Sequence, residues 1–307
     1  MVDSFNRGRK NLKMRKIQKI LIIGADGQLG FDLVKVLEKE YKLLTPTIEE
    51  LDITDFKKTR EYILKNSPDL IINTAAFHNV DECEKNPEKS FLVNTLAVKN
   101  LAEICKEKDI VLVHISTDYV FGLDKNRKTP YTENDLPGPV NIYGISKLAG
   151  EYCIRYILEK YFIVRPAALF GVAGCKEKGR LNFVETMIKL AKEGKEIKVK
   201  NDEFTSPTYT KELAEQIKEL IKTEHYGIYH ITNHGECSWY EFAKKIFELM
   251  NLKVNCQPVS SNQFPTFAKR PSYSVLENKK LKELGIDKMS HWQEALKKYL
   301  KEKGHIK

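Results

Sequence analysis

Three side chains in the middle of this 307-residue chain have the types and the spacing to deliver a proton to a carbonyl oxygen. Tyr143 and Lys147 are four residues apart, so they share one face of a helix, and Thr117 follows an apolar run that is typical of a strand. A phenol has a pKa of about 10, and it exchanges protons readily at neutral pH only where a positive charge favours its anion. Lys147 would supply that charge, and the Thr117 hydroxyl would hydrogen-bond the same substrate oxygen. We therefore expect these three residues to catalyse a carbonyl reduction that uses hydride from a nicotinamide cofactor.

A glycine turn near the start of the chain predicts where such a cofactor would bind. We expect a strand at 17–23, whose residues 20–23 are continuously apolar as in a buried strand, and apolar positions recur at helical spacing over 29–37. Glycines between a strand and a helix allow close backbone approach to a pyrophosphate, which then lies at the amino terminus of the helix. The residues expected to bind the cofactor here are Gly24, Gly27, Gln28, Leu29 and Gly30.

Strand and helix patterns alternate along the rest of the chain. Further strands are expected at 41–44, 70–73, 110–115, 161–165, 197–200 and 227–232. Further helices are expected at 55–66, 91–108, from Tyr143 onward, and at 181–192, 211–221, 239–250 and 292–301. Such alternation predicts an α/β fold, a Rossmann-type doubly wound parallel sheet with a smaller carboxy-terminal substrate lobe. We expect the dinucleotide-binding domain at 17–165 plus about 205–235, and the substrate-binding lobe at about 166–204 and 236–303.

The net charge of +9 does not indicate a nucleic-acid partner. The first 19 residues hold seven basic residues and one acidic residue, so most of the excess lies in a basic leader, residues 1–16, which we expect to be disordered. No aromatic or RNA-binding pattern accompanies these charges. No apolar run is long enough for a signal peptide or a membrane span, so we expect a cytoplasmic protein with no membrane partner.

The six cysteines include no C-x-x-C pair, which argues against a zinc site and against a disulfide framework. His230 and His234 are four residues apart, but they straddle an expected strand and turn and would not share a face. We therefore expect no metal.

Several motifs in this order resemble the extended short-chain dehydrogenase/reductase family, and more narrowly the dTDP-4-dehydrorhamnose reductases. Besides the glycine turn, the resemblance rests on five motifs: residues 73–76 with Val80 and Asp81, residues 116–122, residues 141–151, Asn182 with Phe183, and residues 269–271. It covers about residues 19–300.

The resemblance implies an enzyme that reduces the C4 ketone of a nucleotide-linked deoxysugar, with dTDP-4-dehydrorhamnose to dTDP-L-rhamnose as the expected reaction. It implies that the cofactor is also lined by Asp52, Ile53, Ala75 and Ala76, together with Tyr143 and Lys147. It implies a substrate-binding set of Thr117, Asp118, Ala168, Asn182 and Arg270. An arginine is well suited to a nucleotide diphosphate, which is the role expected of Arg270. A homodimer is left open.

Two positions depart from the family pattern. Ala168 stands where these reductases usually carry a tryptophan against the sugar, which leaves room for a different sugar or nucleotide. Phe77, His78 and Asn79 replace the usual His-Thr-Ala triplet beside the cofactor, and His78 is an alternative substrate contact.

The choice between NADPH and NADH depends on the residues that follow the second strand. An acidic residue there would bind the ribose 2′-hydroxyl of NADH, but residues 44–47 read Leu-Thr-Pro-Thr. We therefore favour NADPH and keep NADH as the alternative, because no arginine marks a phosphate pocket.

Three other functions can be weighed against the reductase. A dehydratase of the same superfamily would have an Asp-Glu pair after the threonine, whereas Asp118 is followed by Tyr119. An epimerase would use the same Tyr143 and Lys147 and return the hydride to the sugar. A cofactor-binding regulatory subunit, like the methionine adenosyltransferase beta subunit, would keep the fold without the chemistry.

Overall fold

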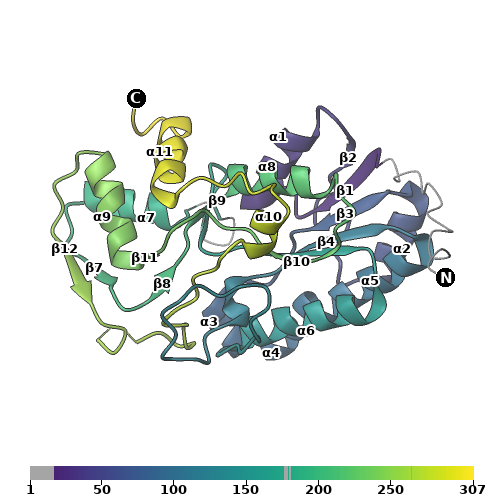
Figure 1. The fold of residues 1–307 in the computed structure, drawn as a ribbon, viewed down its shortest axis with the longest axis horizontal. Helices are drawn as coiled ribbons and strands as arrows, with labels where there is room; N and C mark the ends of the chain where they lie inside the picture. The colour runs from purple at the N-terminus through teal and green to yellow at the C-terminus, as the bar shows by residue number, and fades with distance from the viewer. Residues whose placement is uncertain (1–16, 176–178, 180, 264) are drawn as a thin grey trace, which may run out of the picture.

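The computed structural model describes residues 17–175, 179, 181–263 and 265–307. The expected basic leader, residues 1–16, lies outside the described residues. Within them the chain forms a sheet domain and a second group of helices and short strands, which lie at the right and the left of Figure 1.

Six parallel strands form the central sheet, in the order β10-β5-β4-β3-β1-β2. Their bounds are β1 Lys19–Ile23, β2 Lys42–Leu44, β3 Leu70–Asn73, β4 Val111–Ile115, β5 Tyr161–Arg165 and β10 Gly227–His230. From β1 the chain first adds β2 on one side and then β3, β4 and β5 on the other, so its direction reverses between β1 and β3. Ligands of open α/β sheets bind outside the carboxyl ends of the strands at such a reversal. The predicted doubly wound parallel sheet is confirmed.

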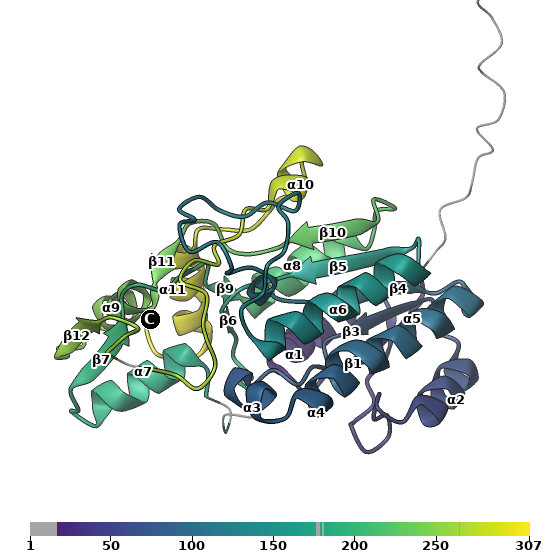
Figure 2. The ribbon, with the colours of Figure 1, turned by 90° about the horizontal axis from the view of Figure 1, so that it is seen from below.

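Helices cover both faces of this sheet because the strands are apolar on both sides. Ile20 and Ile22 pack in one core with α1 (Gln28–Leu37) and α8 (Thr210–Leu220). Leu21 and Ile23 point the other way, since successive side chains of a strand alternate. They pack in a second core with α2 (Phe56–Asn66), α5 (Ala97–Lys108) and α6 (Ile142–Ile157). Figure 2 shows α5 and α6 side by side along this second face.

The second group of elements has a core of its own, rich in aromatic side chains. Its helices are α7 (Phe183–Lys192), α9 (Trp239–Leu249) and α11 (Trp292–Glu302), and Phe170, Phe242 and Tyr299 pack among them. Its strands form three pairs: β6 (Leu169–Phe170) with β9 (Thr208–Tyr209), β7 (Ile197–Lys200) with β12 (Cys256–Val259), and β8 (Phe204–Thr205) with β11 (Cys237–Ser238). The helix α10 (Lys279–Glu283) lies within the residues proposed for the lobe, yet its Leu281 packs in the core of the sheet domain.

The single helix expected at 91–108 is wrong in its first turns. The structure has α4 (Pro87–Phe91), then a π-helical turn η1 (Leu92–Leu96), and only then α5; α3 (Val80–Lys85) precedes them. The wider π-turn directs two side chains at the helix α6: Asn94 donates to the Ser146 hydroxyl at 3.0 Å, and Thr95 donates to the Ser146 carbonyl at 2.7 Å. Such turns are often found at functional sites, and this one fixes α6 against the sheet domain.

The contact between η1 and α6 requires a glycine. A Cβ on Gly150 would lie 2.3 Å from the carbonyl oxygen of Asn94, which is backbone and cannot move aside cheaply. Gly144 has the same role at the start of α6, where a Cβ would lie 2.1 Å from the carbonyl oxygen of Tyr119.

We expect Gly150→Ala to lower the free energy of unfolding by about 1–3 kcal/mol, because it overpacks this contact. Alanine is the better helix former by about 1 kcal/mol, so propensity alone predicts the opposite sign. Urea unfolding measures the difference. The matched control is Arg155→Ala on the exposed side of α6, which should change stability by less than about 0.5 kcal/mol. A stabilised Gly150→Ala protein would contradict the packing argument.

Candidate active site

The turn after β1 is built for a bound phosphate. Gly24 has a φ of 81°, and a Cβ there would lie 2.6 Å from the Thr74 hydroxyl; a Cβ on Gly30 would lie 2.1 Å from the Gly24 carbonyl oxygen. The helix α1 begins after Gly27, and no side chain caps it, so its first N–H groups have no side-chain acceptor. Because such a helix terminus attracts anions, these residues fit the pyrophosphate of a dinucleotide.

The next side chain in the turn, Gln28, ties the cofactor segment to the lobe. Its amide nitrogen donates to the Leu169 carbonyl at 3.1 Å, and its amide oxygen accepts from the Gly171 N–H at 3.0 Å. Asn182 donates to the same oxygen at 3.3 Å and also caps α7, accepting from the Glu185 N–H at 3.0 Å. The structure thus gives both amides positioning contacts, and direct ligand contacts by them stay predictions.

The other residues expected to line the cofactor lie in the loop after β3 and in the segment between β2 and α2. Ala75 and Ala76 follow Thr74 in the loop after β3, where Ala75 lies beside Gly24, and the Ala75 N–H donates to Asn73 at 3.1 Å. Ile53 is buried in the second core, and Asp52 accepts from the N–H of Thr54 at 2.9 Å, so it stabilises its own turn. Their contacts with a cofactor stay predictions.

The helix α6, which carries Tyr143 and Lys147, is held at its first turn by three hydrogen bonds. Asn141 caps it, accepting from the Gly144 N–H at 2.8 Å, and also donates to the Lys269 carbonyl at 2.9 Å. Glu84, from α3, accepts from the Ile142 N–H at 2.7 Å. Tyr143 therefore projects from a turn that is fixed on both sides. Its partly buried ring meets the Tyr119 ring edge-on, with centroids 5.9 Å apart.

One turn after Tyr143, Lys147 is almost completely buried, with 1% of its surface exposed. Its Nζ donates to the Ile115 carbonyl at 2.6 Å and lies 3.2 Å from Nε2 of His114. Burial lowers the pKa of Lys147 to about 8, although the charge of Glu151 opposes this shift. At neutral pH the ammonium form still prevails, so Lys147 can supply the positive charge that the phenol of Tyr143 needs.

The predicted hydroxyl of Thr117 lies two residues after the end of β4. Thr117 caps the short 3-10 helix η2 (Asp118–Val120): it accepts from the Tyr119 N–H and donates to Asp118, both at 3.1 Å. Asp118 also accepts from the Ser274 hydroxyl at 2.6 Å, and burial raises its pKa to about 6. Because η2 packs against α6, the structure brings Thr117, Asp118 and Tyr143 to the same end of the sheet, and their roles toward a substrate stay predictions.

A buried ion pair lies beneath these residues. Glu151 of α6 accepts from Nη2 of Arg165 at 2.6 Å and from its Nε at 2.9 Å. The Ser116 hydroxyl donates to the same carboxylate at 2.5 Å, directly before Thr117. Burial of both charges is tolerable because each is paired and hydrogen-bonded. The pair thus fixes the end of β4 and the end of β5 to the catalytic helix.

The remaining predicted residues lie on three separate loops. Arg270 donates to Asp81 at 3.0 Å and to the Ala268 carbonyl at 3.3 Å, so it joins the segment 268–271 to α3. Ala168 lies between β5 and β6 in the left-handed region, with a φ of 42°, which is strained for a residue with a Cβ. His78 lies 3.4 Å from the Cys175 sulfur. Contacts of all three with substrate stay predictions.

Two residues of the site were not anticipated from the sequence, Asn73 and His114. Both are completely buried, and they face each other in the register between β3 and β4. The signal was present, because each is a polar residue in an otherwise apolar strand, on the side that faces α5 and α6.

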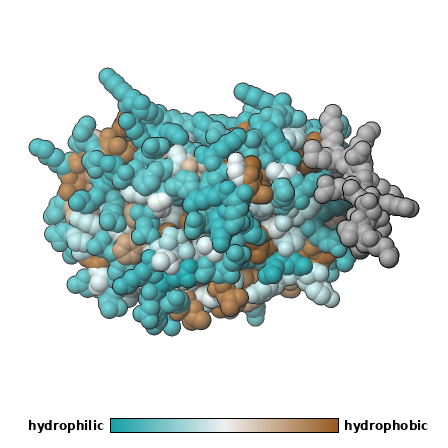
Figure 3. Space-filling view, in the orientation of Figure 1, coloured by the Kyte–Doolittle hydropathy of each residue, from teal (hydrophilic) through white to brown (hydrophobic). Residues whose placement is uncertain are grey.

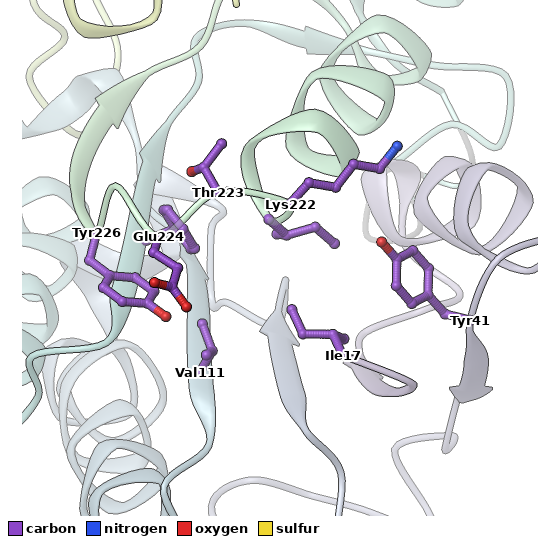
Figure 4. Close-up of a pocket in the computed structure, with 9 residues that line it drawn as sticks. Ile17, Tyr41, Val111, Lys222, Thr223, Glu224 and Tyr226 are labelled. Carbon is purple, nitrogen blue, oxygen red and sulfur yellow. The ribbon is translucent and has the colours of Figure 1, made fainter. Parts of the chain in front are cut away.

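The hollow shown in Figure 4 is separate from the residues described above. It has a volume of about 190 Å³ and is lined by Ile17, Tyr41, Val111, Glu224 and Tyr226, among others. Val111 begins β4, so this hollow lies at the amino ends of the strands, away from Thr117. It is not part of the catalytic site.

The described residues hold no group of three or more His, Cys, Asp or Glu side chains that could bind a metal ion. None of the helices in this part of the chain is long and apolar enough to span a membrane.

Comparisons with known proteins show the family to which this chain belongs. Residues 18–304 match the family model of the RmlD substrate binding domain. The chain is 40% identical over 286 residues to the spore coat polysaccharide biosynthesis protein SpsK of Bacillus subtilis, covering 93% of this chain and 98% of that protein. It is 34% identical to the dTDP-4-dehydrorhamnose reductase of Escherichia coli, covering 92% and 97%.

Solved structures are similar as well. The dTDP-4-dehydrorhamnose reductase of Bacillus anthracis, determined in complex with NADP, superposes with a TM-score of 0.88 at 41% identity, covering 94% of this chain and all of that one. The UDP-glucose 4-epimerase of Thermotoga maritima has a TM-score of 0.78 at 18% identity, covering 92% and 98%, which shows the shared fold alone. The chain therefore belongs to the RmlD family of nucleotide-sugar ketoreductases, and it is an NAD(P)-dependent oxidoreductase.

Proposed function

We propose that this protein uses NADPH to reduce the C4 ketone of a nucleotide-linked deoxysugar, converting dTDP-4-dehydrorhamnose to dTDP-L-rhamnose. The observation that carries the proposal is the placement of Thr117, Tyr143 and the buried Lys147 at the carboxyl end of β4, near the reversal point of the sheet. The reductases of the same name among its relatives support the choice of sugar and nucleotide.

The residues of the turn after β1 support binding of a dinucleotide. The segment after β2 supports NADPH, the cofactor with a 2′-phosphate, over NADH. The uncapped start of α1 and the close approach of Gly24 to Thr74 would hold the pyrophosphate. Directly after β2 the chain has no carboxylate that would repel a 2′-phosphate, and Glu50 caps its own turn by accepting from the Thr47 N–H at 2.8 Å. NADP in the Bacillus anthracis reductase agrees with this choice.

The chemistry of the chain itself is proton transfer and charge stabilisation. When bound, the nicotinamide would supply the hydride. Tyr143 gives its phenolic proton to the oxygen that develops negative charge, and Thr117 turns its hydroxyl from Asp118 to the same oxygen. Lys147, as an ammonium, stabilises the phenolate that Tyr143 leaves behind. None of these reaction steps requires a metal ion.

Two alternatives remain distinguishable by cofactor use. An epimerase would retain its cofactor without net consumption, and a regulatory subunit would bind it without turnover. The intact set of Thr117, Tyr143 and Lys147 favours the enzyme over the subunit. The strained backbone at Ala168 favours a binding surface for the sugar at that loop, since strain of this kind persists mainly at functional sites.

We also infer a cytoplasmic protein and keep a homodimer as a proposal. No disulfide joins any of the six cysteines, all of which lie within the described residues, and this suits a reducing compartment. The surface in Figure 3 is mostly hydrophilic, with hydrophobic residues scattered in small spots. An apolar stripe on α6 and η1 would suit a second copy: Leu92, Leu96, Ile145, Tyr152 and Tyr156 are exposed there. The molar mass in solution tests this.

The direct test of the function is an assay with dTDP-4-dehydro-6-deoxy-L-mannose, first with NADPH and then with NADH. We expect loss of absorbance of the reduced cofactor and formation of dTDP-rhamnose, identified by mass analysis, with NADPH as the better donor. Tight binding of NADPH without consumption, together with interconversion of sugars, would support the epimerase. Binding of NADPH with no change in any sugar would support the regulatory subunit.

Replacing Tyr143 by phenylalanine should lower kcat by about 100- to 10,000-fold, because it removes the acid and leaves the shape of the site intact. Binding of NADPH, followed by fluorescence titration, should change little. The matched control is Tyr152→Phe on the same helix, whose ring is half exposed and which should retain full activity. Equal kcat values for Tyr143→Phe and the unmodified protein would exclude the proposed mechanism.

Arg270 offers a test of substrate binding. If it binds the diphosphate, Arg270→Gln should raise the KM for the nucleotide sugar by about 10-fold or more and leave the KM for NADPH unchanged, since a charge-assisted hydrogen bond contributes about 1.5–3 kcal/mol. Asp81→Asn breaks the same ion pair but keeps the guanidinium of Arg270. The KM for the nucleotide sugar should therefore stay within about 3-fold of the value for the unmodified protein. Equal effects of both variants on KM would show that Arg270 acts only by joining its loop to α3.

A further inference from the structure

A buried chain of three polar side chains links β3, β4 and α6 beneath the catalytic residues. Asn73 Nδ2 lies 3.3 Å from His114 Nδ1, and His114 Nε2 lies 3.2 Å from Lys147 Nζ. Each of the three side chains is 0–1% exposed. Because no water can replace a missing partner at such depth, the direction of each hydrogen bond matters.

The direction at Asn73 is fixed by the backbone. Its Oδ1 accepts from the Ala75 N–H at 3.1 Å, so the amino group of its side chain must face His114. An amino group only donates, and Nδ1 of His114 must therefore accept. A neutral imidazole has one proton, which this arrangement places on Nε2, directed at Lys147.

This direction conflicts with a charged Lys147. An ammonium has three hydrogens and no lone pair, so it cannot accept from the Nε2–H of His114. If Lys147 is charged, His114 must carry its proton on Nδ1, and the hydrogen bond from Asn73 is lost. If Lys147 is an uncharged amine, it accepts from Nε2–H while still donating to the Ile115 carbonyl, and all partners are satisfied.

We propose that Asn73 and His114 are positioning residues that couple the tautomer of His114 to the ionisation of Lys147, and so favour the uncharged form of Lys147. This inference deepens the proposed function, because Lys147 is the residue that would stabilise the phenolate of Tyr143. It assigns no proton transfer to His114. The effect is on equilibrium: Asn73 makes the ammonium less favourable by requiring that one buried hydrogen bond break.

Electrostatics within the site agree with this assignment. Burial and, secondly, the charge of Lys147 hold the pKa of His114 well below its usual range, so His114 stays uncharged and can change only its tautomer. Burial lowers the pKa of Lys147 to about 8, which brings its ionisation within reach of an ordinary titration. Glu151 acts in the opposite direction and keeps the ammonium from being lost below neutral pH.

The other ionisable groups on the elements around Lys147 are engaged elsewhere. Arg165 of β5 pairs with Glu151, Asp118 of η2 is bonded to Ser274, and Glu84 of α3 accepts from the start of α6. On α5, Lys99 and Glu103 pair with each other near Cys153. His114 and Glu151 are therefore the groups expected to govern the ionisation of Lys147, together with Tyr143 one turn away.

The test is the tautomer of His114 in the protein without cofactor or substrate. Long-range 1H–15N spectra of 15N-histidine-labelled protein distinguish Nδ1–H, Nε2–H and imidazolium, and His114→Gln identifies the signal. Between pH 6 and pH 10 we expect His114 to stay neutral and to change from Nδ1–H to Nε2–H, with a midpoint near that of Lys147 measured on 13C-lysine-labelled protein. A single tautomer across this range, or an imidazolium, would overturn the proposal.

Asn73→Asp provides the matched variant. A carboxylate at this position accepts from Nδ1–H at every pH in the range, so His114 should keep the Nδ1–H tautomer and the titration of Lys147 should move up by about one pH unit or more. The control is His305→Gln near the end of the chain, a partly buried histidine whose Nε2 lies 2.9 Å from Glu185 of α7, away from the elements that surround Lys147. It should leave both titrations of the unmodified protein in place, and equal shifts in both variants would overturn the proposal.

An activity measurement adds a readout that a purely structural role would not move. In Asn73→Asp the basic limb of the pH profile of kcat/KM should shift upward with the titration of Lys147, whereas a general loss of stability would lower the profile without moving it. The spectra require neither cofactor nor sugar. An inactive protein would therefore count against the proposed function and leave this test intact.

Discussion

A single buried ammonium sets the requirements that the surrounding structure meets. Lys147 lies between α6 and β4, where a charge without partners would be strongly unfavourable. It is retained there by the Ile115 carbonyl, 2.6 Å away, and by the negative charge of Glu151 one turn later. Glu151 in turn requires Arg165 and the Ser116 hydroxyl, and these two residues lie at the ends of β5 and β4. One charge thus fixes two strands and one helix relative to each other, which is the geometry that Thr117 and Tyr143 need.

The close packing of α6 follows from the same requirement. The helix can approach the sheet domain only because Gly144 and Gly150 remove the Cβ atoms that would strike the backbone. The π-turn of η1 supplies the partners on the other side, where Asn94 and Thr95 reach Ser146. Asn94 also accepts from the Phe77 N–H and donates to the Phe77 carbonyl, so the loop that follows β3 is fixed to the same helix. The residues expected beside the cofactor and the residues expected to act on the sugar are therefore held by one connected set of contacts.

Local patterns in the sequence predicted much of this arrangement. The apolar run before Gly24 and the run before Ser116 each predicted a strand, and β1 and β4 lie there; the spacing of Tyr143 and Lys147 predicted the helix α6. The π-turn could not be predicted in this way, because its cause is not in residues 92–96 alone. It depends on hydrogen bonds to Ser146, about fifty residues later in the chain. Likewise, nothing local to Arg270 indicates that Asp81 would be its partner, since the two meet only when the segment 268–271 returns to α3.

Asn73 and His114 differ from these cases, because each is visible in the sequence as a polar residue within an apolar strand. The hydrophobic periodicity predicted the two strands but gave no role to these two residues. Each occupies an inward position that the alternation of its strand would fill with an apolar side chain, and a buried amide or imidazole is costly unless its hydrogen bonds are made. All of them are made only when Lys147 is uncharged: the Ala75 N–H donates to Asn73, Asn73 donates to His114, and His114 donates to the amine of Lys147. The chain of partners begins at the loop expected to line the cofactor and ends one helical turn from Tyr143. The ring of Tyr143 is partly exposed, so under the proposed function a substrate carbonyl would lie at this end of the chain of partners.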